Sequence, residues 1–379
     1  MTPAIVTVYN ACRAEWGRII STPVDLALLT VMPLMLLGAM AAMLSAGSPH
    51  HLPTVIVDRD GGVLARRIVR AIDASPGLQI VGRVPDVAAA VTMMRREQAV
   101  AAVVIPRGVG TRNAGRAPVE IFHQAAFLST GALAATNLRV AVAATLAQYG
   151  ASTHGLAGLA AIDPALLPGV QVTVLGNPSL SLEWYLGLLL GPGVLHLLIA
   201  VACVGSIGLL MNDGSFAAFA VRGGVAATLA GRLSPHVIAG TFWGVAWLLW
   251  LTLAQGYRAD GSLLLIVAGQ ALLFVATAAV ALLLVAATRS IATALSGAVI
   301  VAGSALAYSG ASLPIDGAGL FARVWHQVLP LTHYMTLQMD QVLGASAGPF
   351  LKAAGTLLVY PLVAGGLGII LIRRDREGR

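Results

Sequence analysis

The sequence predicts a polytopic α-helical membrane protein with an α/β extracytoplasmic domain between its first and second spans. Of its 379 residues, 58% are hydrophobic and only 10% are charged, whereas soluble chains carry about 25% charged residues. Six segments stay apolar over the roughly 20 residues that a helix needs to cross a bilayer. A longer segment between the first two of them is richer in charge and alternates short apolar runs with helical patterns.

Residues 1–23 are expected to form a cytoplasmic interfacial helix. Val8, Cys12, Trp16 and Ile19 recur at helical spacing, which places them on one apolar face, and polar residues such as Glu15 fall on the other faces. Trp16 would anchor this helix at the membrane surface. The alternative is a frayed tail.

Six transmembrane helices are predicted, at about 24–46, 185–211, 235–254, 262–287, 291–311 and 353–372. The first could instead be a signal peptide, because Leu44-Ser45-Ala46 resembles a cleavage site. Its apolar run is too long and begins too far into the chain for that, so we expect an uncleaved anchor. The domain division that follows is 24–46 for the first span, 47–183 for the periplasmic α/β domain and 184–379 for a five-helix bundle.

Arginine placement predicts that both termini are cytoplasmic. Positive charge in short loops marks the cytoplasmic side of a membrane protein. Arginines lie before the first span, between the second and third, between the fourth and fifth, and after the sixth: Arg13, Arg18, Arg222, Arg232, Arg289, Arg373, Arg374, Arg376 and Arg379.

Composition argues against several classes of function. The net charge of +7 does not indicate nucleic-acid binding, because the cations flank apolar runs rather than cluster on a soluble face. Cys12 and Cys203 fall outside the periplasmic domain, so no structural disulfide is expected. His50-His51 lacks further ligands at metal-binding spacing, and we predict neither a metal nor a cofactor in this chain.

The periplasmic domain is predicted from alternating short strands and helices. Strands are expected at 54–57, 78–81, 99–105 and 119–122, and helices at 64–72, 86–98 and 129–149. Asp58 and Asp60 could belong to a metal site or a catalytic pair, but Asp and Gly are also ordinary turn formers, and we interpret them as a turn.

Known catalytic motifs are absent from the sequence. There is no P-loop for nucleotide binding, no Gly-x-Ser-x-Gly and no His-Glu-x-x-His. The spans contain few ionisable side chains, and His196 could be either a functional group or a hydrogen-bonded structural one. Because no acidic residue lies at mid-depth, an ion-driven pump is not indicated, and energy would come from a separate ATPase.

Two regions of the chain resemble one known family. In the periplasmic domain these are Val57-Asp58-Arg59-Asp60, the helix start from Leu64 to Arg67, and 102–106. Between the fifth and sixth spans they are Ser309-Gly310, Leu313-Pro314 and the run Leu329-Pro330-Leu331-Thr332-His333-Tyr334. These features are similar to the permease subunit of type-2 ABC exporters, in the multidrug-type branch with a large periplasmic domain.

The resemblance implies a re-entrant segment at about 312–352, which carries Ser309, Gly310, Pro314, Pro330, Thr332, His333 and Tyr334 as its signature. Irregular backbone at membrane depth requires cover by protein or water. An ordinary outer loop is the alternative.

The resemblance also implies an ATPase-coupling loop between the second and third spans, with Asp213, Gly214, Ser215, Phe216, Arg222 and Arg232. Relatives carry more acidic residues there, whereas this chain has an apolar run from Phe216 to Ala220.

By the same resemblance, the chain would be the membrane-spanning permease subunit of an ATP-driven exporter in the bacterial inner membrane. It would move an amphipathic or drug-like substrate out of the cytoplasm or inner leaflet. The implied partners are an ATP-binding subunit that holds ATP and Mg, a second permease protomer, the lipid bilayer, and a periplasmic adaptor with an outer-membrane channel. Gly187 and Gly191 would permit close helix approach. Two other functions remain open: a receptor or scaffold whose periplasmic domain senses a ligand, and an intramembrane enzyme using His196, His326 or His333.

Overall fold

The computed structural model describes residues 3–44, 51–109, 119–123, 128–159, 181–211, 215–221, 224–310, 315 and 317–377. The chain divides into two compact units, a membrane unit of residues 1–45 and 174–379, and an α/β unit of residues 46–173. Each unit is described by itself.

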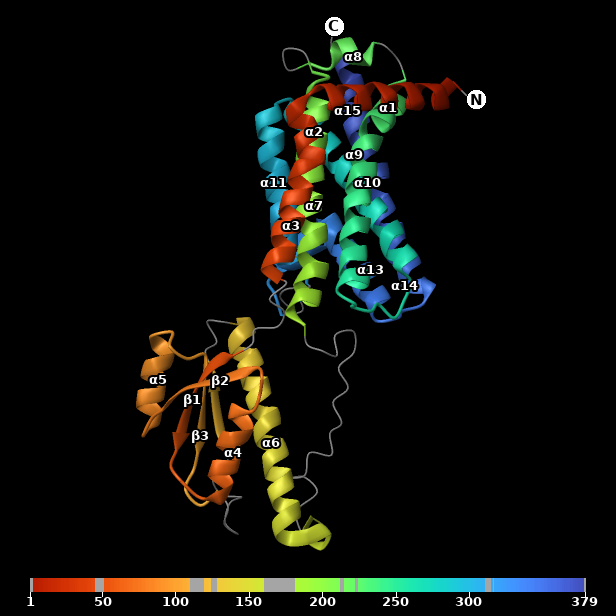
Figure 1. Cartoon of the computed structure of the whole chain (residues 1–379). Helices are drawn as coiled ribbons and strands as arrows, with labels where there is room; N and C mark the ends of the chain where they lie inside the picture. Colours follow the sequence, from red (N-terminus) through yellow and green to blue (C-terminus); the bar gives the residue numbers. More distant parts are fainter. Residues whose placement is uncertain are drawn as a thin grey trace. The chain divides into compact units, whose positions relative to one another are not determined.

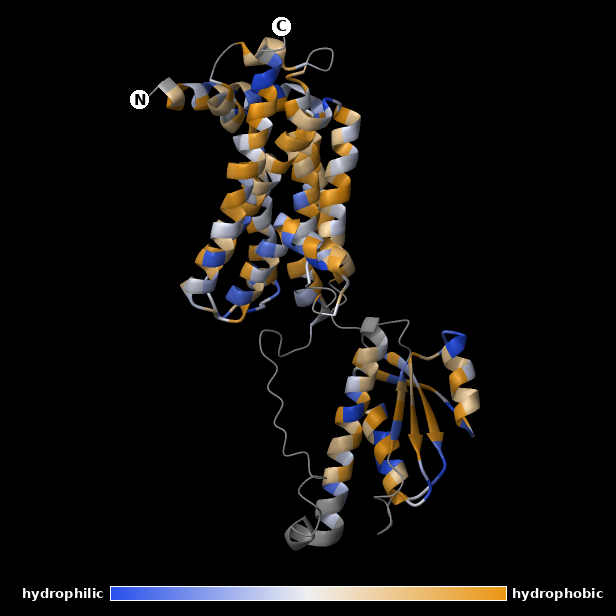
Figure 2. Cartoon of the chain, turned by 180° about the vertical axis from the view of Figure 1, so that it is seen from behind, coloured by the Kyte–Doolittle hydropathy of each residue, from blue (hydrophilic) through white to orange (hydrophobic). Residues whose placement is uncertain are grey.

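Within its described residues, the membrane unit contains six helical segments that are long and apolar enough to cross a bilayer. In chain order they are α2 (Pro23–Leu29) with α3 (Val31–Leu44), α7 (Leu182–Gly208), α9 (Val225–Leu249) with the π-helical turn η2 (Trp250–Ala254), α10 (Leu263–Thr288), α11 (Ile291–Tyr308), and α14 (Ala347–Tyr360) with η3 (Pro361–Gly365) and α15 (Gly366–Glu377). Hydrophobic residues predominate along these helices (Figure 2). The predicted fold class is therefore confirmed.

Serine side chains set the start of three spans. Ser181, Ser262 and Ser290 each accept a hydrogen bond from the backbone N–H three residues later, at 3.2, 3.4 and 3.3 Å. Such caps satisfy donors that the first turn of a helix leaves unpaired. They place the starts of α7, α10 and α11 within three residues of the expected positions.

The third and sixth spans begin earlier than the sequence indicated. Helix α9 starts at Val225 and carries Pro235 inside it, although Pro235 was expected to open the span. Proline favours the first turn of a helix but does not have to mark it. Helix α14 begins at Ala347 rather than near residue 353.

Helix α7 is the most deeply buried of the six spans. In its most apolar window 72% of the residues are buried, against 17% for α2–α3 and 22% for α11. Gly187 and Gly191 lie on α7, and a Cβ on Gly191 would come within 2.2 Å of Trp247 Nε1. The Trp247 indole donates a 2.8 Å hydrogen bond to the Gly187 carbonyl. These glycines thus serve close packing of α7 on α9 within one chain.

The α/β unit is built on a four-stranded sheet in the order β2-β1-β3-β4. Strands β1 (Leu52–Asp58), β2 (Leu78–Arg83) and β3 (Ala101–Ile105) are parallel, and β4 (Glu120–His123) runs antiparallel to β3. Helices α4 (Val63–Asp73) and α6 (Leu128–Leu159) cover one face, and α5 (Val87–Arg95) covers the other (Figure 1). Because both faces are covered, β3 is buried along its whole length.

Asp58 and Asp60 shape the turn after β1. Asp58 Oδ1 accepts hydrogen bonds from the backbone of Asp60 and Gly61, at 3.0 and 2.9 Å. Asp60 accepts from Gly62 and from Gly108, at 3.0 and 2.6 Å. The described residues contain no cluster of three or more His, Cys, Asp or Glu side chains arranged to hold a metal. These contacts account for both carboxylates as turn formers.

Candidate functional site

The loop between α7 and α9 contains a short buried helix, α8 (Ala217–Ala220), at the end of the membrane unit that carries both termini (Figure 1). Phe216 precedes it and is only 1% exposed. The backbone N–H of Phe216 donates a 2.9 Å hydrogen bond to the Asp375 carboxylate of α15. Ser215 Oγ accepts from the Ala217 backbone at 3.1 Å.

Asp375 holds a second partner besides Phe216. Its other carboxylate oxygen pairs with Arg289, which lies at the turn between α10 and α11. Arg289 has a positive φ of 51° and ends α10. One carboxylate therefore connects α8, the turn between α10 and α11, and the sixth span.

The predicted coupling residues are only partly brought together. Ser215 and Phe216 lie at the start of α8, whereas Arg232 lies on α9 and points into a separate cluster described below. Asp213, Gly214 and Arg222 lie outside the described residues.

A buried cluster of charges joins α1 (Pro3–Ser21) to three other helices. We call it the α1 charge cluster, and it comprises Glu15, Arg18, Asp25, Ser206 and Arg232. Glu15 is 1% exposed. Its carboxylate receives hydrogen bonds of 2.6 Å from both Arg18 Nη2 and Ser206 Oγ, and Arg232 Nη2 lies 3.3 Å away.

Arginines keep the Glu15 carboxylate ionised in this buried position. Burial by itself raises the pKa of Glu15, but hydrogen bonds from Arg18 and Ser206 and the charge of Arg232 outweigh it, so the pKa lies below the ordinary value. Arg18 also pairs with Asp25 at the start of the first span. Arg232 Nε donates to the Ser206 carbonyl at 3.1 Å. The cluster thus fixes α1 against α2, α7 and α9.

Helical spacing places Glu15 among the polar residues away from the apolar face of α1 and does not predict its deep burial. Helical periodicity separates apolar from polar residues but does not show which polar residues face protein. The one available signal was the spacing of Glu15 and Arg18, which lie three residues apart on a helix. Gly231 of α9 allows α1 to pack closely against α9, because a Cβ at this position would come within 2.2 Å of the Val8 carbonyl oxygen.

The segment between α11 and α14 forms two short helices, α12 (Leu320–Val328) and α13 (Pro330–Val342). Pro330 opens α13, and Leu331, Thr332 and Tyr334 are buried in its first turns. Burial raises the pKa of the Tyr334 hydroxyl above its ordinary value. His333 Nε2 lies 3.0 Å from the Gln327 carbonyl.

Ser309 and Gly310 follow the last residue of α11, and Gly310 lies close to His326 of α12. Ser309 Oγ donates to the Leu306 carbonyl at 3.0 Å. Gly310 has a φ of +77°, a conformation that other residues rarely adopt. His326 Nδ1 lies 2.7 Å from the Tyr308 carbonyl. The structure thus brings Gly310 against α12 and leaves Ser309 at the end of α11. Pro330, Thr332, His333 and Tyr334 share the first turns of α13, and Pro314 lies outside the described residues.

Two buried glutamines of α13 were missed by the sequence analysis. Gln338 Nε2 donates a 2.7 Å hydrogen bond to the Leu188 carbonyl of α7. Gln341 Oε1 accepts from the Ser262 backbone at 3.2 Å, next to the start of α10. They fasten α13 to the bundle.

His196 is buried on α7 with a polar neighbour. Its Nδ1 lies 2.7 Å from Thr277 Oγ1 of α10, and the same hydroxyl donates to the Leu273 carbonyl at 2.7 Å. His196 thus links two packed spans.

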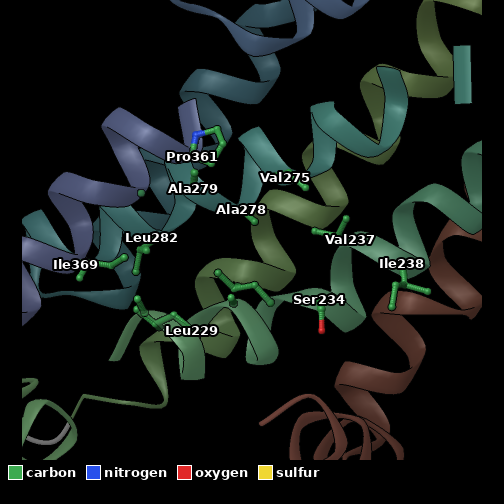
Figure 3. Close-up of a pocket in the computed structure, with 14 residues that line it drawn as sticks. Leu229, Ser234, Val237, Ile238, Val275, Ala278, Ala279, Leu282, Pro361 and Ile369 are labelled. Carbon is green, nitrogen blue, oxygen red and sulfur yellow. The ribbon is translucent and has the colours of Figure 1, made fainter. Parts of the chain in front are cut away.

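An apolar pocket of about 330 Å³ lies between α9, α10 and the sixth span. Figure 3 shows its lining, in which Leu229, Leu282 and Ile369 come from three different helices and Ser234 contributes a hydroxyl. The lining fits an acyl chain or the apolar part of an amphipathic molecule.

These observations define a multi-pass membrane protein with a short helix, α8, between its second and third spans. At the end of the membrane unit that carries both termini, α8 is hydrogen-bonded to the sixth span. The family described as "ABC-2 family transporter protein" matches residues 25–370 of the chain. Because this match spans most of the chain, the protein belongs to that family. It is a transmembrane permease and not the ATPase. A comparison with curated proteins gives no match.

Proposed function

We propose that this chain is the permease subunit of an ATP-driven exporter that moves an amphipathic or drug-like substrate out of the cytoplasm or inner leaflet. ABC-2 permeases generally pair with ATP-binding subunits. The proposal rests on Asp375 of α15. Its carboxylate binds the Phe216 N–H at the start of α8 and also pairs with Arg289 at the turn between α10 and α11.

The ATP-binding subunit, which holds ATP and Mg, would dock against α8. Coupling of ATP binding to the spans would start at this helix. A push on α8 reaches α15 through Asp375 and the turn between α10 and α11 through Arg289. The α1 charge cluster supports the neighbouring helices, because Arg232 and Ser206 lie on the two spans that flank α8. ATP can drive transport only if its binding favours one arrangement of these helices over the other.

A second permease protomer would pack against the side of the bundle formed by α3, α7 and α11. Helices α2–α3 and α11 are the least buried spans, and both pack on α7. Their outward side chains are large and apolar, for example Met35 on α3 and Ile300 on α11, which are 65% and 62% exposed. This surface offers a dimer interface or a lipid-facing wall for cargo.

The apolar pocket of Figure 3 favours an amphipathic cargo. Ala226 and Leu229 of its lining belong to the first turns of α9, which follow α8 in the chain. The apolar part of a cargo that enters from the inner leaflet would therefore reach the pocket near the coupling helix.

The α/β unit would lie in the periplasm and contact an adaptor that leads to an outer-membrane channel. Support for this partner is the size of the unit and its position between the first and second spans. Crosslinking in the native membrane tests it, and recovery of the permease and ATPase without an adaptor would contradict it.

The proposal is tested by co-purifying the permease with its ATP-binding partner and measuring ATP hydrolysis in lipid vesicles. Amphipathic compounds should change the rate in the complex. Asp375→Asn should reduce this response, because the neutral amide cannot hold Arg289 and the Phe216 N–H as strongly. Arg374→Gln is the matched control on the same helix, since Arg374 is exposed. Equal responses in the two variants would refute coupling through Asp375.

A further inference from the structure

A polar pocket of about 580 Å³ lies between α12, α13 and α14. Helices α13 and α14 stand at the end of the membrane unit opposite both termini (Figure 1). The pocket is therefore separate from the coupling helix α8 and from the apolar pocket of Figure 3. Nothing proposed above for ATP coupling uses it.

Two opposite charges face this pocket. Asp340 of α13 and Lys352 of α14 both line it. Neither side chain forms an ion pair, with the other or with any other residue that the structure describes. Lys352 is also the only lysine in the sequence. A pocket that presents an unpaired carboxylate and an unpaired ammonium is complementary to a ligand with both a cationic and an anionic group.

A third polar group in the lining lacks a partner. Thr332 is 1% exposed, and its hydroxyl makes no hydrogen bond to any residue that the structure describes. Buried polar groups in folded proteins are almost always paired, so this residue of the lining is an exception. The first turn of α14, at Gly348 and Pro349, also lines the pocket. The backbone N–H of Gly348 at this helix N-terminus favours an anion such as a phosphate, whereas Pro349 has no N–H to donate.

His333 adds no charge to the pocket at neutral pH. Burial lowers its pKa, and although the Gln327 carbonyl raises it, the net pKa lies below the ordinary value. Asp340 and Lys352 therefore carry the fixed charges on these walls.

The surroundings of the pocket are apolar and exposed. On α12, Leu320 and Phe321 are 70% and 71% exposed, and no residue of that helix is buried. On α14, Leu351 is 67% exposed beside Lys352. In a membrane protein such faces contact acyl chains, and α12 is amphipathic in the manner of interfacial helices. A ligand with a charged head and apolar tails fits both the pocket and its borders.

We propose that this pocket binds the zwitterionic headgroup of a membrane phospholipid. The phosphate lies beside Lys352 and the first turn of α14, and the ammonium lies beside Asp340. The acyl chains run along the exposed faces of α12 and α14.

Because Lys352 is the only lysine, its reaction with an amine-specific reagent reports on occupancy of the pocket. The protein is placed in nanodiscs of phosphatidylcholine or of phosphatidylglycerol, and labelling is measured by peptide mass spectrometry. Phosphatidylcholine has no primary amine and does not consume the reagent. A lysine introduced by Arg323→Lys on the exposed surface of α12 serves as an internal reference, since Arg323 does not line the pocket.

Relative to that reference, Lys352 should react about fivefold more slowly in phosphatidylcholine than in phosphatidylglycerol, as expected for one added ion pair. Asp340→Asn should abolish the difference, and Asp260→Asn, a carboxylate outside the lining, should preserve it. Equal labelling in the two lipids would overturn the proposal whether or not the Asp340 variant folds. A second result would also overturn the proposal. If water-soluble glycerophosphocholine, added in detergent, protects Lys352 from labelling as strongly as the lipid does, the ligand is a free solute and not a membrane lipid.

Discussion

Glu15 is a carboxylate buried on α1 whose charge is balanced by Arg18 and Arg232. Glu15→Gln leaves Arg232 without an anion and leaves Arg18 with Asp25 as its only anionic partner among the described residues. Removal of one member of a buried ionic group costs about 3 kcal/mol or more. We expect a lower thermal midpoint in detergent and faster hydrogen exchange of α1. Arg13→Gln, an exposed cation on the same helix, should change neither, and equal effects of the two variants would contradict this role.

The pH dependence of the same group has a defined sign. A carboxylate with a depressed pKa stabilises the folded state at pH above its ordinary value, here 4.5, and this contribution is lost as the pH falls below it. The stability difference between the native chain and Glu15→Gln should therefore be constant near neutral pH and shrink on acidification below 4.5. Melting curves across this range measure it. A difference that grows on acidification would show that Glu15 is protonated in the folded state.

Position 310 requires glycine mainly because of its backbone conformation, and not only because little space is left for a side chain. Its φ is +77°, and a Cβ would lie 3.3 Å from His326 Cε1. Gly310→Ala should destabilise the protein by about 1–2 kcal/mol. Gly303→Ala on α11, where a Cβ meets nothing within 4 Å, should be neutral or stabilising, because alanine favours a helix. Denaturation in detergent compares them, and an equal loss in both would exclude strain at Gly310.

At the scale of elements, the six spans could be predicted because apolar length alone defines them. The starts of α10 and α11 were predicted closely, because the apolar runs begin next to Ser262 and Ser290, which cap these helices in the structure. The start of α9 was misplaced because Pro235 lies inside a helix that continues on both sides. The contacts of Asp375 and Gln338 could not be foreseen, because they join segments far apart in the chain and only the fold brings those together.

The contact between α1 and α9 depends on a glycine at Gly231. A Cβ there would meet the Val8 carbonyl at 2.2 Å, so Gly231→Val should force α1 away from α9. We expect increased hydrogen exchange of α1 and weaker stimulation of ATP hydrolysis by cargo, with insertion of the spans unchanged. The matched control is Gly205→Ala, since a Cβ on Gly205 meets nothing within 4 Å. Unchanged protection of α1 in Gly231→Val would contradict the proposed packing.

For the whole molecule, the arginine pattern predicts both termini in the cytoplasm and the α/β unit outside it. This can be tested in a chain with Cys12→Ser and Cys203→Ser, which removes both native thiols. A membrane-impermeant maleimide should label Arg59→Cys in intact spheroplasts, and Arg374→Cys only after the membrane is opened. If only Arg374→Cys were labelled in intact spheroplasts, the orientation of the chain would be the opposite of the predicted one.

We propose that this permease moves cargo only when a separate ATPase drives it. The most direct measurement is uptake of a fluorescent amphipathic compound into inverted membrane vesicles that contain the permease and its ATP-binding partner. We expect uptake that requires ATP, stops when the P-loop lysine of the partner is replaced, and falls in Asp375→Asn. Uptake of equal rate without ATP or without the partner would contradict it.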